Sequence, residues 1–163
     1  MSFRKTPRGT RGKPAMTANP VSRAVMKGME RFHHWRGDRF QGMDLLYLTT
    51  VGAKSGARRR VSVARFPDEN GWLVVASMAG SRDNPAWYHN IAAHPDQVWA
   101  EVGGREFPVR VEQLEGAARD AAWNRICVEQ PRFHGYEQKT DRVMPVLKLT
   151  PNADQPPGRG QPR

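Results

Sequence analysis

The residues from 49 to 60 combine tight-turn glycines with a dense set of hydrogen-bond donors. Gly52 and Gly56 permit the backbone to turn closely and to expose its N–H groups. The cationic and hydroxyl donors around them are Lys54, Ser55, Arg58, Arg59 and Arg60. Such donors suit a bound anion, although the Gly-x-x-x-x-Gly-Lys-Ser/Thr order of a nucleotide-binding loop is absent. The stretch predicts either an anion site or a basic hairpin turn.

A second stretch, residues 76–90, places small residues at the end of a predicted strand and a helix shortly after it. The small or flexible residues are Ala76, Ser77 and Met78, and the helix start and its first turns contain Asn84, Pro85, Ala86, Trp87 and Asn90. A planar cofactor ring could approach such a backbone closely, with its edge hydrogen-bonded by peptide groups. The alternative is a plain strand-to-helix connection in which Trp87 and Tyr88 fill the core.

Other kinds of chemistry lack the residues that they need. His33 and His34 are adjacent, His89 and His94 are five apart, and Cys127 is the single cysteine, so no metal site is predicted. No Gly-x-Ser-x-Gly elbow is present, and no acid pair suited to hydrolysis is evident. The chemistry would therefore have to come from a bound cofactor.

The elements that must position these residues are mostly short strands. Alternating or β-branched residues predict strands over 45–51, 61–66, 72–77, 98–102, 107–111 and 143–149. Helices are predicted over 86–93, with Asn84 as its cap, over 115–129, and near Tyr136. Tight turns such as Asn70-Gly71 join consecutive strands, which makes the pairing antiparallel. The predicted fold class is α+β, mainly β: a small antiparallel barrel with flanking helices.

Length and charge predict one domain with two tails. The chain has 163 residues, with 26 Lys and Arg against 16 Asp and Glu. Residues 1–18 have the composition of a disordered basic arm, residues 19–150 form the domain and begin with a helix over 19–36, and residues 151–163 form a disordered tail rich in Pro and Gly.

The basic arm raises the question of anionic partners. It could contact an anionic membrane surface or nucleic acid, or it could be a solvated tail. Phe3 is its one aromatic residue, which makes nucleic acid the weaker prediction. The sequence contains no apolar run of 18 residues and no signal peptide. A cytoplasmic protein is predicted, with peripheral membrane contact as an option.

A family resemblance links these stretches. The matching text is Leu48–Gly52 with Lys54-Ser55-Gly56 and Arg59, Val74–Ser77 with Gly80, Asn84–Tyr88 with Asn90, His94-Pro95, Tyr136, Thr140-Asp141-Arg142 and Met144-Pro145-Val146. In this order and spacing it resembles the deazaflavin-dependent nitroreductase family of actinobacteria, which are split β-barrel oxidoreductases of the FMN-binding type that use coenzyme F420. The resemblance covers roughly residues 42–150.

The resemblance implies a role for each site residue. Lys54, Ser55, Gly56 and Arg59 would hold the phosphate and acidic glutamyl tail of F420, and Arg58 and Arg60 would extend this groove. The deazaflavin ring would lie against Ala76, Ser77, Met78, Asn84, Pro85, Ala86, Trp87 and Asn90. Tyr136 would lie near the acceptor, where a phenol can orient an oxygen atom or supply a proton.

The implied function is hydride transfer from reduced deazaflavin to a planar electrophile: a quinone, an enone or a nitroaromatic. Gln130 and Phe133 stand where nitroreductase-active members have tyrosine, so the acceptor pocket differs. Two alternatives stay open: the same barrel holding FMN, and a non-catalytic protein that binds the cofactor or a lipid. The longer anionic tail of F420 suits the basic cluster better than the single phosphate of FMN. The protein is expected to be a monomer or homodimer.

Overall fold

The structure is a computed structural model that describes residues 3–15, 24–25, 37, 39–152 and 158–159. Its strands are β1 Arg39–Phe40, β2 Met43–Val51, β3 Arg58–Ala64, β4 Phe66–Asp68, β5 Gly71–Val75, β6 Trp99–Val102, β7 Arg105–Gln113, β8 Val146–Pro151 and β9 Gly158–Arg159. Its helices are the short η1 Met78–Gly80, α2 Ala86–Ala93, α3 Gly116–Glu129 and α4 Arg132–Gln138. Of the predicted helix over residues 19–36, Ala24 and Val25 are described and are helical, and the rest lies outside the described residues.

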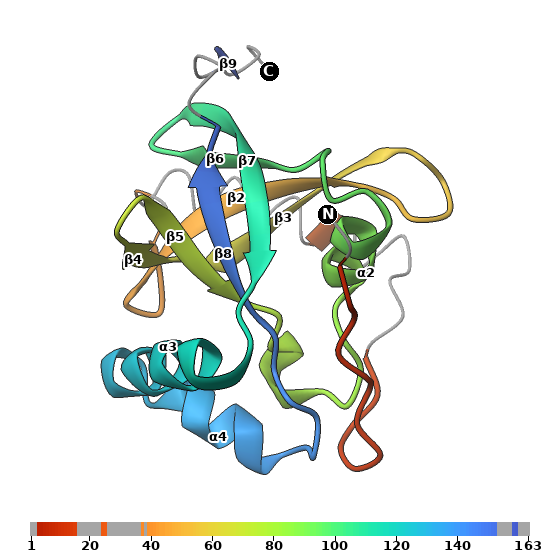
Figure 1. The fold of residues 1–163 in the computed structure, drawn as a ribbon, viewed down its shortest axis with the longest axis vertical. Coiled ribbons are helices and arrows are strands. Elements are labelled where there is room, and N and C mark those ends of the chain that lie inside the picture. The colour runs from red at the N-terminus through yellow and green to blue at the C-terminus, as the bar shows by residue number, and fades with distance from the viewer. Residues whose placement is uncertain (1–2, 16–23, 26–36, 38, 153–157, 160–163) are drawn as a thin grey trace.

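All strands join one curled antiparallel sheet, which confirms the predicted pairing. The order is β1-β2-β6-β7-β8-β5-β4, with β3 paired to β2 and β9 paired to β7. The sheet curls until β3 contacts β5, and within the described residues no ladder joins these two strands. Figure 1 shows α3 and α4 together at one end of the sheet, while α2 lies beside the protruding β2–β3 hairpin.

Two clusters of buried side chains explain how the sheet is covered on both faces. Side chains alternate between the faces of a strand, so on β5 Val74 enters one cluster while Leu73 and Val75 enter the other. The first cluster fills the barrel and includes residues of α2, among them Tyr88 and Ile91. The second cluster packs the outer face of the sheet against Trp123, Ile126 and Phe133 of α3 and α4.

The element boundaries differ from the predicted ones near the candidate site. Strand β3 begins at Arg58 rather than at residue 61, because the three arginines pair with β2. Strand β5 ends at Val75 rather than at residue 77, because the carbonyl oxygens of Ala76 and Ser77 bond to a side chain instead of a neighbouring strand. Helix α2 has its predicted bounds, but Pro85 rather than Asn84 is its N-cap.

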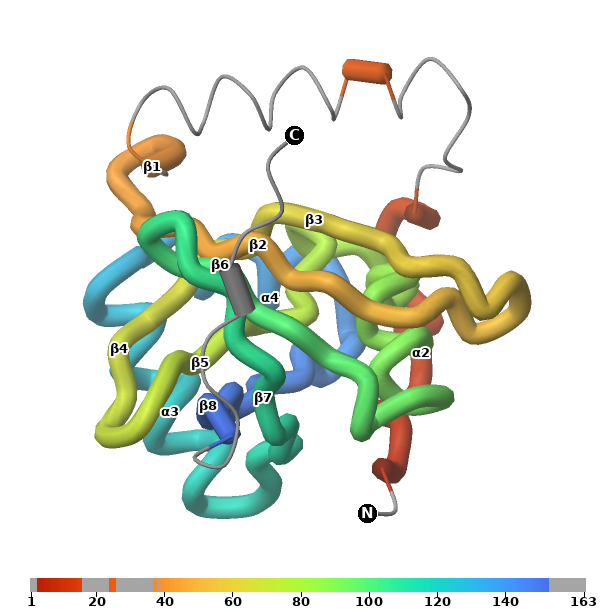
Figure 2. Tube along the Cα trace, turned by 90° about the horizontal axis from the view of Figure 1, so that it is seen from above, coloured from red at the N-terminus to blue at the C-terminus, as the bar shows by residue number. Residues whose placement is uncertain are grey.

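The N-terminal segment is held against the body, unlike the disordered arm that composition predicts. Figures 1 and 2 both show residues 3–15 running beside α2. The backbone N–H of Thr6 donates to the Tyr88 hydroxyl at 2.8 Å, and that of Gly9 donates to the Arg82 carbonyl at 2.7 Å. In the C-terminal tail, Gly158 and Arg159 pair with β7. Composition could not reveal either contact, because the partners lie far away in the sequence.

Candidate functional site

The predicted anion loop is the turn of the β2–β3 hairpin. Two backbone hydrogen bonds close it, from the Gly52 N–H to the Ala57 carbonyl at 2.8 Å and from the Gly56 N–H to the Gly52 carbonyl at 2.9 Å. Gly56 has a φ of +68°, which a glycine adopts without strain. Within the described part of the chain, the N–H groups of Lys54 and Ser55 donate to no protein acceptor. The loop therefore presents two backbone donors and one exposed ammonium group to a ligand.

Asn90 holds this loop rather than facing a ligand with a free amide. Its Nδ2 donates to the Thr50 hydroxyl at 3.1 Å, and its Oδ1 accepts the Ala53 N–H at 3.0 Å. Asn90 is 8% exposed and is the fifth of the eight residues of α2. A buried amide with both ends bonded fixes the groups that it contacts. Helix α2 thus positions the loop.

The strand register divides the three arginines between two faces of the sheet. Arg58 pairs with Val51, Arg59 with Thr50 and Arg60 with Thr49, and directly paired residues share a face while consecutive residues alternate. Arg58 stacks over Trp99 at 4.0 Å, and Arg60 contacts Tyr47 and forms an ion pair with Glu101.

Arg59 shares a face with Thr50, whose hydroxyl bonds to Asn90. The face of Arg59 is therefore the one that adjoins α2 and the Asn90 amide. Arg58 and Arg60 point the other way, so the structure does not bring the four cations of the predicted groove onto one side. Lys54, Ser55 and Gly56 lie in the turn of the hairpin, and Arg59 is the arginine on the face that adjoins α2.

The predicted ring-facing segment has an unusual backbone. Met78, Ala79 and Gly80 have φ values of +46°, +50° and +84°, and non-glycine residues rarely adopt this conformation. Within the described residues the N–H groups of Met78 and Ala79 find no acceptor, whereas those of Gly80 and Ser81 bond back to Ser77 and Met78. Met78 is 37% exposed. The segment thus offers backbone donors beside an accessible apolar side chain.

Arg142 lies behind this segment and was not among the predicted site residues. Its side chain is almost fully buried, at 3% exposure. It donates to the carbonyl oxygens of Ala76 at 2.8 Å, Ser77 at 2.7 Å and Ser81 at 2.9 Å. A fourth bond of 2.7 Å goes to Asn84 Oδ1. Burial lowers the pKa of Arg142 below its usual value.

Most of the other residues predicted to face the ring are buried or hydrogen-bonded within the protein. The Asn84 amide bonds to Arg142 through Oδ1 and to the Thr6 carbonyl through Nδ2, at 2.8 Å. Trp87 is 9% exposed and belongs to the barrel core, as the core-filling interpretation of this stretch expects. Pro85 and Ala86 are the N-cap and first residue of α2. Ser77, Met78 and Ala86 are therefore the members with surface available to a ligand.

Tyr136 lies on α4, and α4 packs against η1. The carbonyl oxygen of Tyr136 is 2.9 Å from where a Cβ on Gly80 would be, so no larger residue fits at position 80 without movement. The Tyr136 ring contacts Phe133 edge-on at 5.4 Å, and the Lys139 ammonium lies 5.5 Å from its centre. The predicted acceptor-side residue and the predicted ring segment are thus neighbours.

The N-terminal segment borders the same place and is anchored by two carboxylates. Asp141 accepts bonds from the N–H groups of Thr10 and Arg11 at 2.8 Å each and from the Thr10 hydroxyl, which hold its pKa at about 2. Asp83 accepts the Ala15 N–H at 2.9 Å and pairs with Arg8 at 3.0 Å. The bond from Ala15, more than the neighbouring arginines, lowers the pKa of Asp83.

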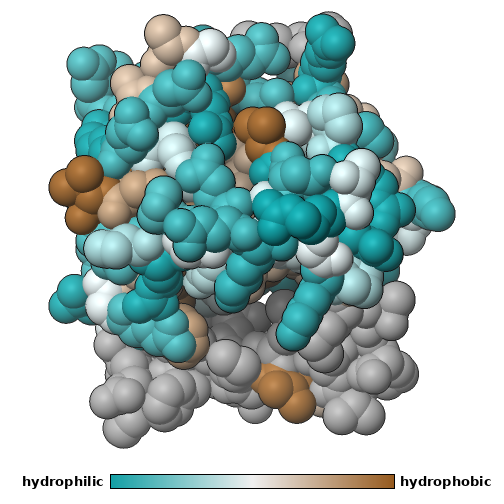
Figure 3. Space-filling view, turned by 90° about the horizontal axis from the view of Figure 1, so that it is seen from below, coloured by the Kyte–Doolittle hydropathy of each residue, from teal (hydrophilic) through white to brown (hydrophobic). Residues whose placement is uncertain are grey.

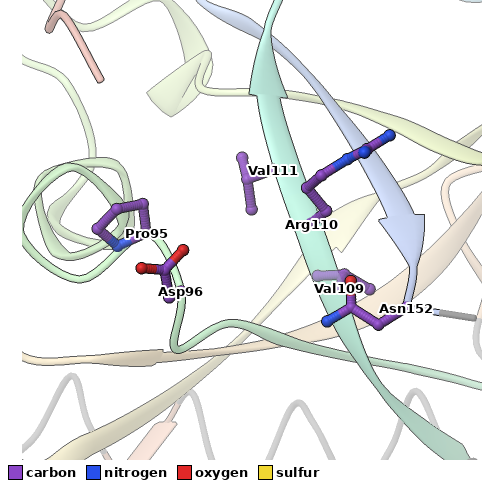
Figure 4. A pocket seen from close by; sticks show the side chains of 6 residues that line it. All are labelled: Pro95, Asp96, Val109, Arg110, Val111 and Asn152. Carbon is purple, nitrogen blue, oxygen red and sulfur yellow. The ribbon is translucent and has the colours of Figure 1, made fainter. Parts of the chain in front are cut away.

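Other surface features of the described residues do not compete with this site. A cavity of about 260 Å³ between the end of α2 and β7 is lined by Pro95, Asp96, Val109, Arg110, Val111 and Asn152 (Figure 4), and it contains no predicted site residue. Figure 3 shows the face on the α3 and α4 side, where hydrophobic residues of the described chain are scattered singly among hydrophilic ones. Scattered apolar residues are usual on a protein surface.

The described residues offer neither a metal site nor a membrane-spanning helix. No group of three or more His, Cys, Asp or Glu side chains is placed to hold a metal ion. No helix in this part of the chain combines the length and the apolar character needed to cross a membrane. The predicted membrane contact of the basic segment stays a prediction.

Comparison with known proteins identifies the family. The model of the F420H(2)-dependent quinone reductase family matches residues 21–151. The chain belongs to this family. An F420H(2)-dependent quinone reductase of Mycobacterium tuberculosis is 35% identical over 108 residues, which are 64% of this chain and 72% of that protein. The sequence resemblance named the deazaflavin-dependent nitroreductase family. The matching family has another name, but both names refer to the cofactor F420.

Solved structures of relatives confirm the fold of this quinone reductase family member. An F420-H2 dependent reductase named FDR-A is 34% identical, with a TM-score of 0.58 over 64% of this chain and 92% of that one. A second structure, described as a domain-swapped dimer, is 29% identical, with a TM-score of 0.59 over 80% of this chain and 99% of that one. The expectation of a monomer or homodimer for this chain stays a prediction.

Proposed function

We propose that this protein is an F420H2-dependent reductase that transfers a hydride to a quinone-type acceptor. The membership of residues 21–151 in the quinone reductase family carries the proposal. Two features of the described residues support it: η1 packs against α4, which carries Tyr136, and the turn at 52–57 presents unpaired backbone donors beside Lys54. FMN, the alternative cofactor of the sequence prediction, receives no support from the family or from its named relatives.

The donors of this chain fit the chemistry of F420. The cofactor carries a phosphodiester and several carboxylates, and Lys54, Arg59 and the free N–H groups of the hairpin turn offer charge and hydrogen bonds to such a tail. The ring edge carries carbonyl oxygens, which need donors such as the N–H groups of Met78 and Ala79. The exposed Met78 side chain supplies an apolar surface for the ring.

The chain's own part in the reaction is positioning. When bound, the reduced cofactor supplies the hydride, and a quinone that receives this hydride and one proton becomes a hydroquinone. We assign Tyr136 to the acceptor oxygen, where its hydroxyl can donate a hydrogen bond and pass a proton. Residues 77–80 and α4 hold the two partners within reach of each other and limit the water between them.

Fluorescence titration of the purified protein with F420, and separately with FMN, tests this function. We expect F420 to bind, with an affinity that falls as salt is added, because the tail is held by charge. Stopped-flow oxidation of bound F420H2 by a benzoquinone then tests turnover. Binding without oxidation by any quinone, enone or nitroaromatic would favour the non-catalytic binding protein instead. Binding of FMN alone would overturn the proposal.

A further inference from the structure

We propose that Arg142 is the positioning residue of the cofactor-ring segment, and that its four hydrogen bonds aim the backbone N–H groups of Ser77 and Met78 at the ring. The identity of the ligand in this inference rests on the proposed function. The positioning by Arg142 rests on the hydrogen bonds of the chain itself. The Arg142 side chain is itself buried, so it acts on the cofactor through the segment that it binds.

The first argument is the direction of the peptide groups. In a trans peptide the C=O of one residue and the N–H of the next point in opposite directions. Arg142 binds the carbonyl oxygens of Ala76 and Ser77 on its own side, at 2.8 and 2.7 Å. The N–H groups of Ser77 and Met78 must therefore point away from Arg142. Two successive donors are turned outward by one guanidinium group.

The second argument is the strained backbone that follows. Met78 and Ala79 both have positive φ, a conformation that non-glycine residues keep when the surrounding structure fixes it. Arg142 fixes both flanks of this turn, because it also bonds to the Ser81 carbonyl at 2.9 Å and to Asn84 Oδ1 at 2.7 Å. One planar side chain thus ties together residues on both sides of the turn.

The third argument is the burial of the Arg142 guanidinium group among neutral acceptors. Arg142 is 3% exposed, and all four of its acceptors are neutral oxygen atoms. A buried charge is costly unless its donors are well bonded. The planar fork of arginine can reach four acceptors in fixed directions, which the single ammonium group of lysine cannot.

The test compares Arg142→Lys with Arg119→Lys. Arg119 is a matched control, because its side chain is also largely buried and donates to a backbone carbonyl, that of Met144, at 2.9 Å. Its other contacts, with Trp123 and Asp120, lie on α3, away from the ring segment. The probes are F420 and its deazaflavin riboside, which keeps the ring and lacks the phosphate and glutamates.

The expected result has two parts. Arg142→Lys weakens the binding of F420 and of the riboside by the same factor, about tenfold or more, because a lost set of charge-assisted bonds misplaces the donors for the ring alone. In the protein without cofactor, hydrogen–deuterium exchange rises at Gly80 and Ser81, whose N–H groups bond back to Ser77 and Met78, and stays unchanged in the 52–57 loop. Arg119→Lys changes neither affinity by more than about twofold, because the contacts of Arg119 are with Met144, Asp120 and Trp123 and not with the ring segment.

The opposite outcomes are distinct from failure of the proposed function. Unchanged exchange at Gly80 and Ser81, or equal loss of affinity in both variants, overturns the positioning role. A wild-type protein that binds neither F420 nor the riboside overturns the proposed function and the ligand part of this inference with it. If Arg142→Lys does not fold, Asn84→Ala removes one of the four acceptors, and we then expect a smaller rise of exchange at the same residues.

Discussion

Arg58 and Arg59 are neighbours in the sequence and lie on opposite faces of the β2–β3 hairpin. Arg58 stacks on Trp99 at 4.0 Å, whereas Arg59 is paired with Thr50 on the face that adjoins α2. A cluster of three consecutive arginines therefore cannot act as one cationic surface. The distinction follows from the alternation of side chains along a strand and gives a pair of variants with the same charge change.

Arg59→Ala and Arg58→Ala differ in F420 binding if the hairpin holds the acidic tail. We expect Arg59→Ala to weaken F420 binding about tenfold or more, because a charge-assisted bond to a carboxylate or phosphate is lost. It should also reduce the salt dependence of the affinity. Arg58→Ala should change the affinity by less than about threefold, as expected for a charge on the far face. Fluorescence titration at two salt concentrations measures both.

A larger effect of Arg58→Ala than of Arg59→Ala would contradict this assignment and would move the tail to the face with Trp99 and Glu101. Equal and small effects would leave Lys54 and the backbone donors as the tail site. The riboside without phosphate and glutamates serves as the internal control, since its affinity should be the same in both variants.

Asn90→Ala should loosen the tail loop while sparing the ring segment. The amide of Asn90 bonds to Thr50 and to Ala53, and its removal leaves the buried Thr50 hydroxyl without this bond, at a cost of about 1–3 kcal/mol in the free energy of unfolding. We expect weaker binding of F420 and an unchanged affinity for the riboside. Asn124→Ala, on the exposed side of α3, is the control. A loss of riboside affinity would place Asn90 at the ring instead.

Tyr136→Phe separates the acceptor step from cofactor binding. The ring of Tyr136 packs edge-on against Phe133 at 5.4 Å, and phenylalanine preserves that contact while removing the hydroxyl. We expect the rate of F420H2 oxidation by a quinone to fall about 100-fold, the scale of a lost proton donor, with F420 affinity unchanged. Single-turnover kinetics measure the step. An unchanged rate would remove Tyr136 from the reaction and leave it as a packing residue.

Local patterns in the sequence were sufficient for most of the fold. The Asn70-Gly71 turn and the antiparallel strands around it were predicted from turn chemistry, and α2 was predicted with its bounds from Pro85 and the residues after it. These features depend on neighbouring residues alone. The hairpins β2–β3, β4–β5 and β6–β7 agree with the predicted antiparallel pairing of consecutive strands.

The location of the candidate site could be predicted from the sequence, but its strand register and its hydrogen bonds could not. The stretches 52–60 and 76–90 were chosen for their donors and small residues, but which face Arg59 takes depends on strand register. The roles of Asn84 and Arg142 depend on a bond across 58 positions of sequence. The order of residues 3–15 depends on bonds across as many as 131 positions. Local sequence patterns cannot predict these hydrogen bonds, because the curled sheet brings together residues that are far apart in the sequence.

The docking of the N-terminal segment should depend on the Asp141 carboxylate and on pH. Bonds from Thr10 and Arg11 hold the pKa of Asp141 at about 2, below the ordinary 3.8. A carboxylate with a lowered folded-state pKa stabilises the bound segment fully above the ordinary value and loses this effect as the pH falls toward the lowered one. The segment should therefore stay docked from neutral pH down to about 4 and be released between about 4 and 2.

The amide proton shifts of Thr10 and Arg11, followed by NMR, should titrate together with a midpoint near 2. At pH 7 Asp141→Asn should speed tryptic cleavage after Arg8 and Arg11, because the neutral amide no longer attracts the segment's donors as strongly. Asp120→Asn, at an exposed carboxylate on α3 that contacts Arg119, is the control for the loss of one negative charge. Equal cleavage rates in the two variants would show that the segment is held by its bonds to Tyr88 and Asp83 without help from Asp141.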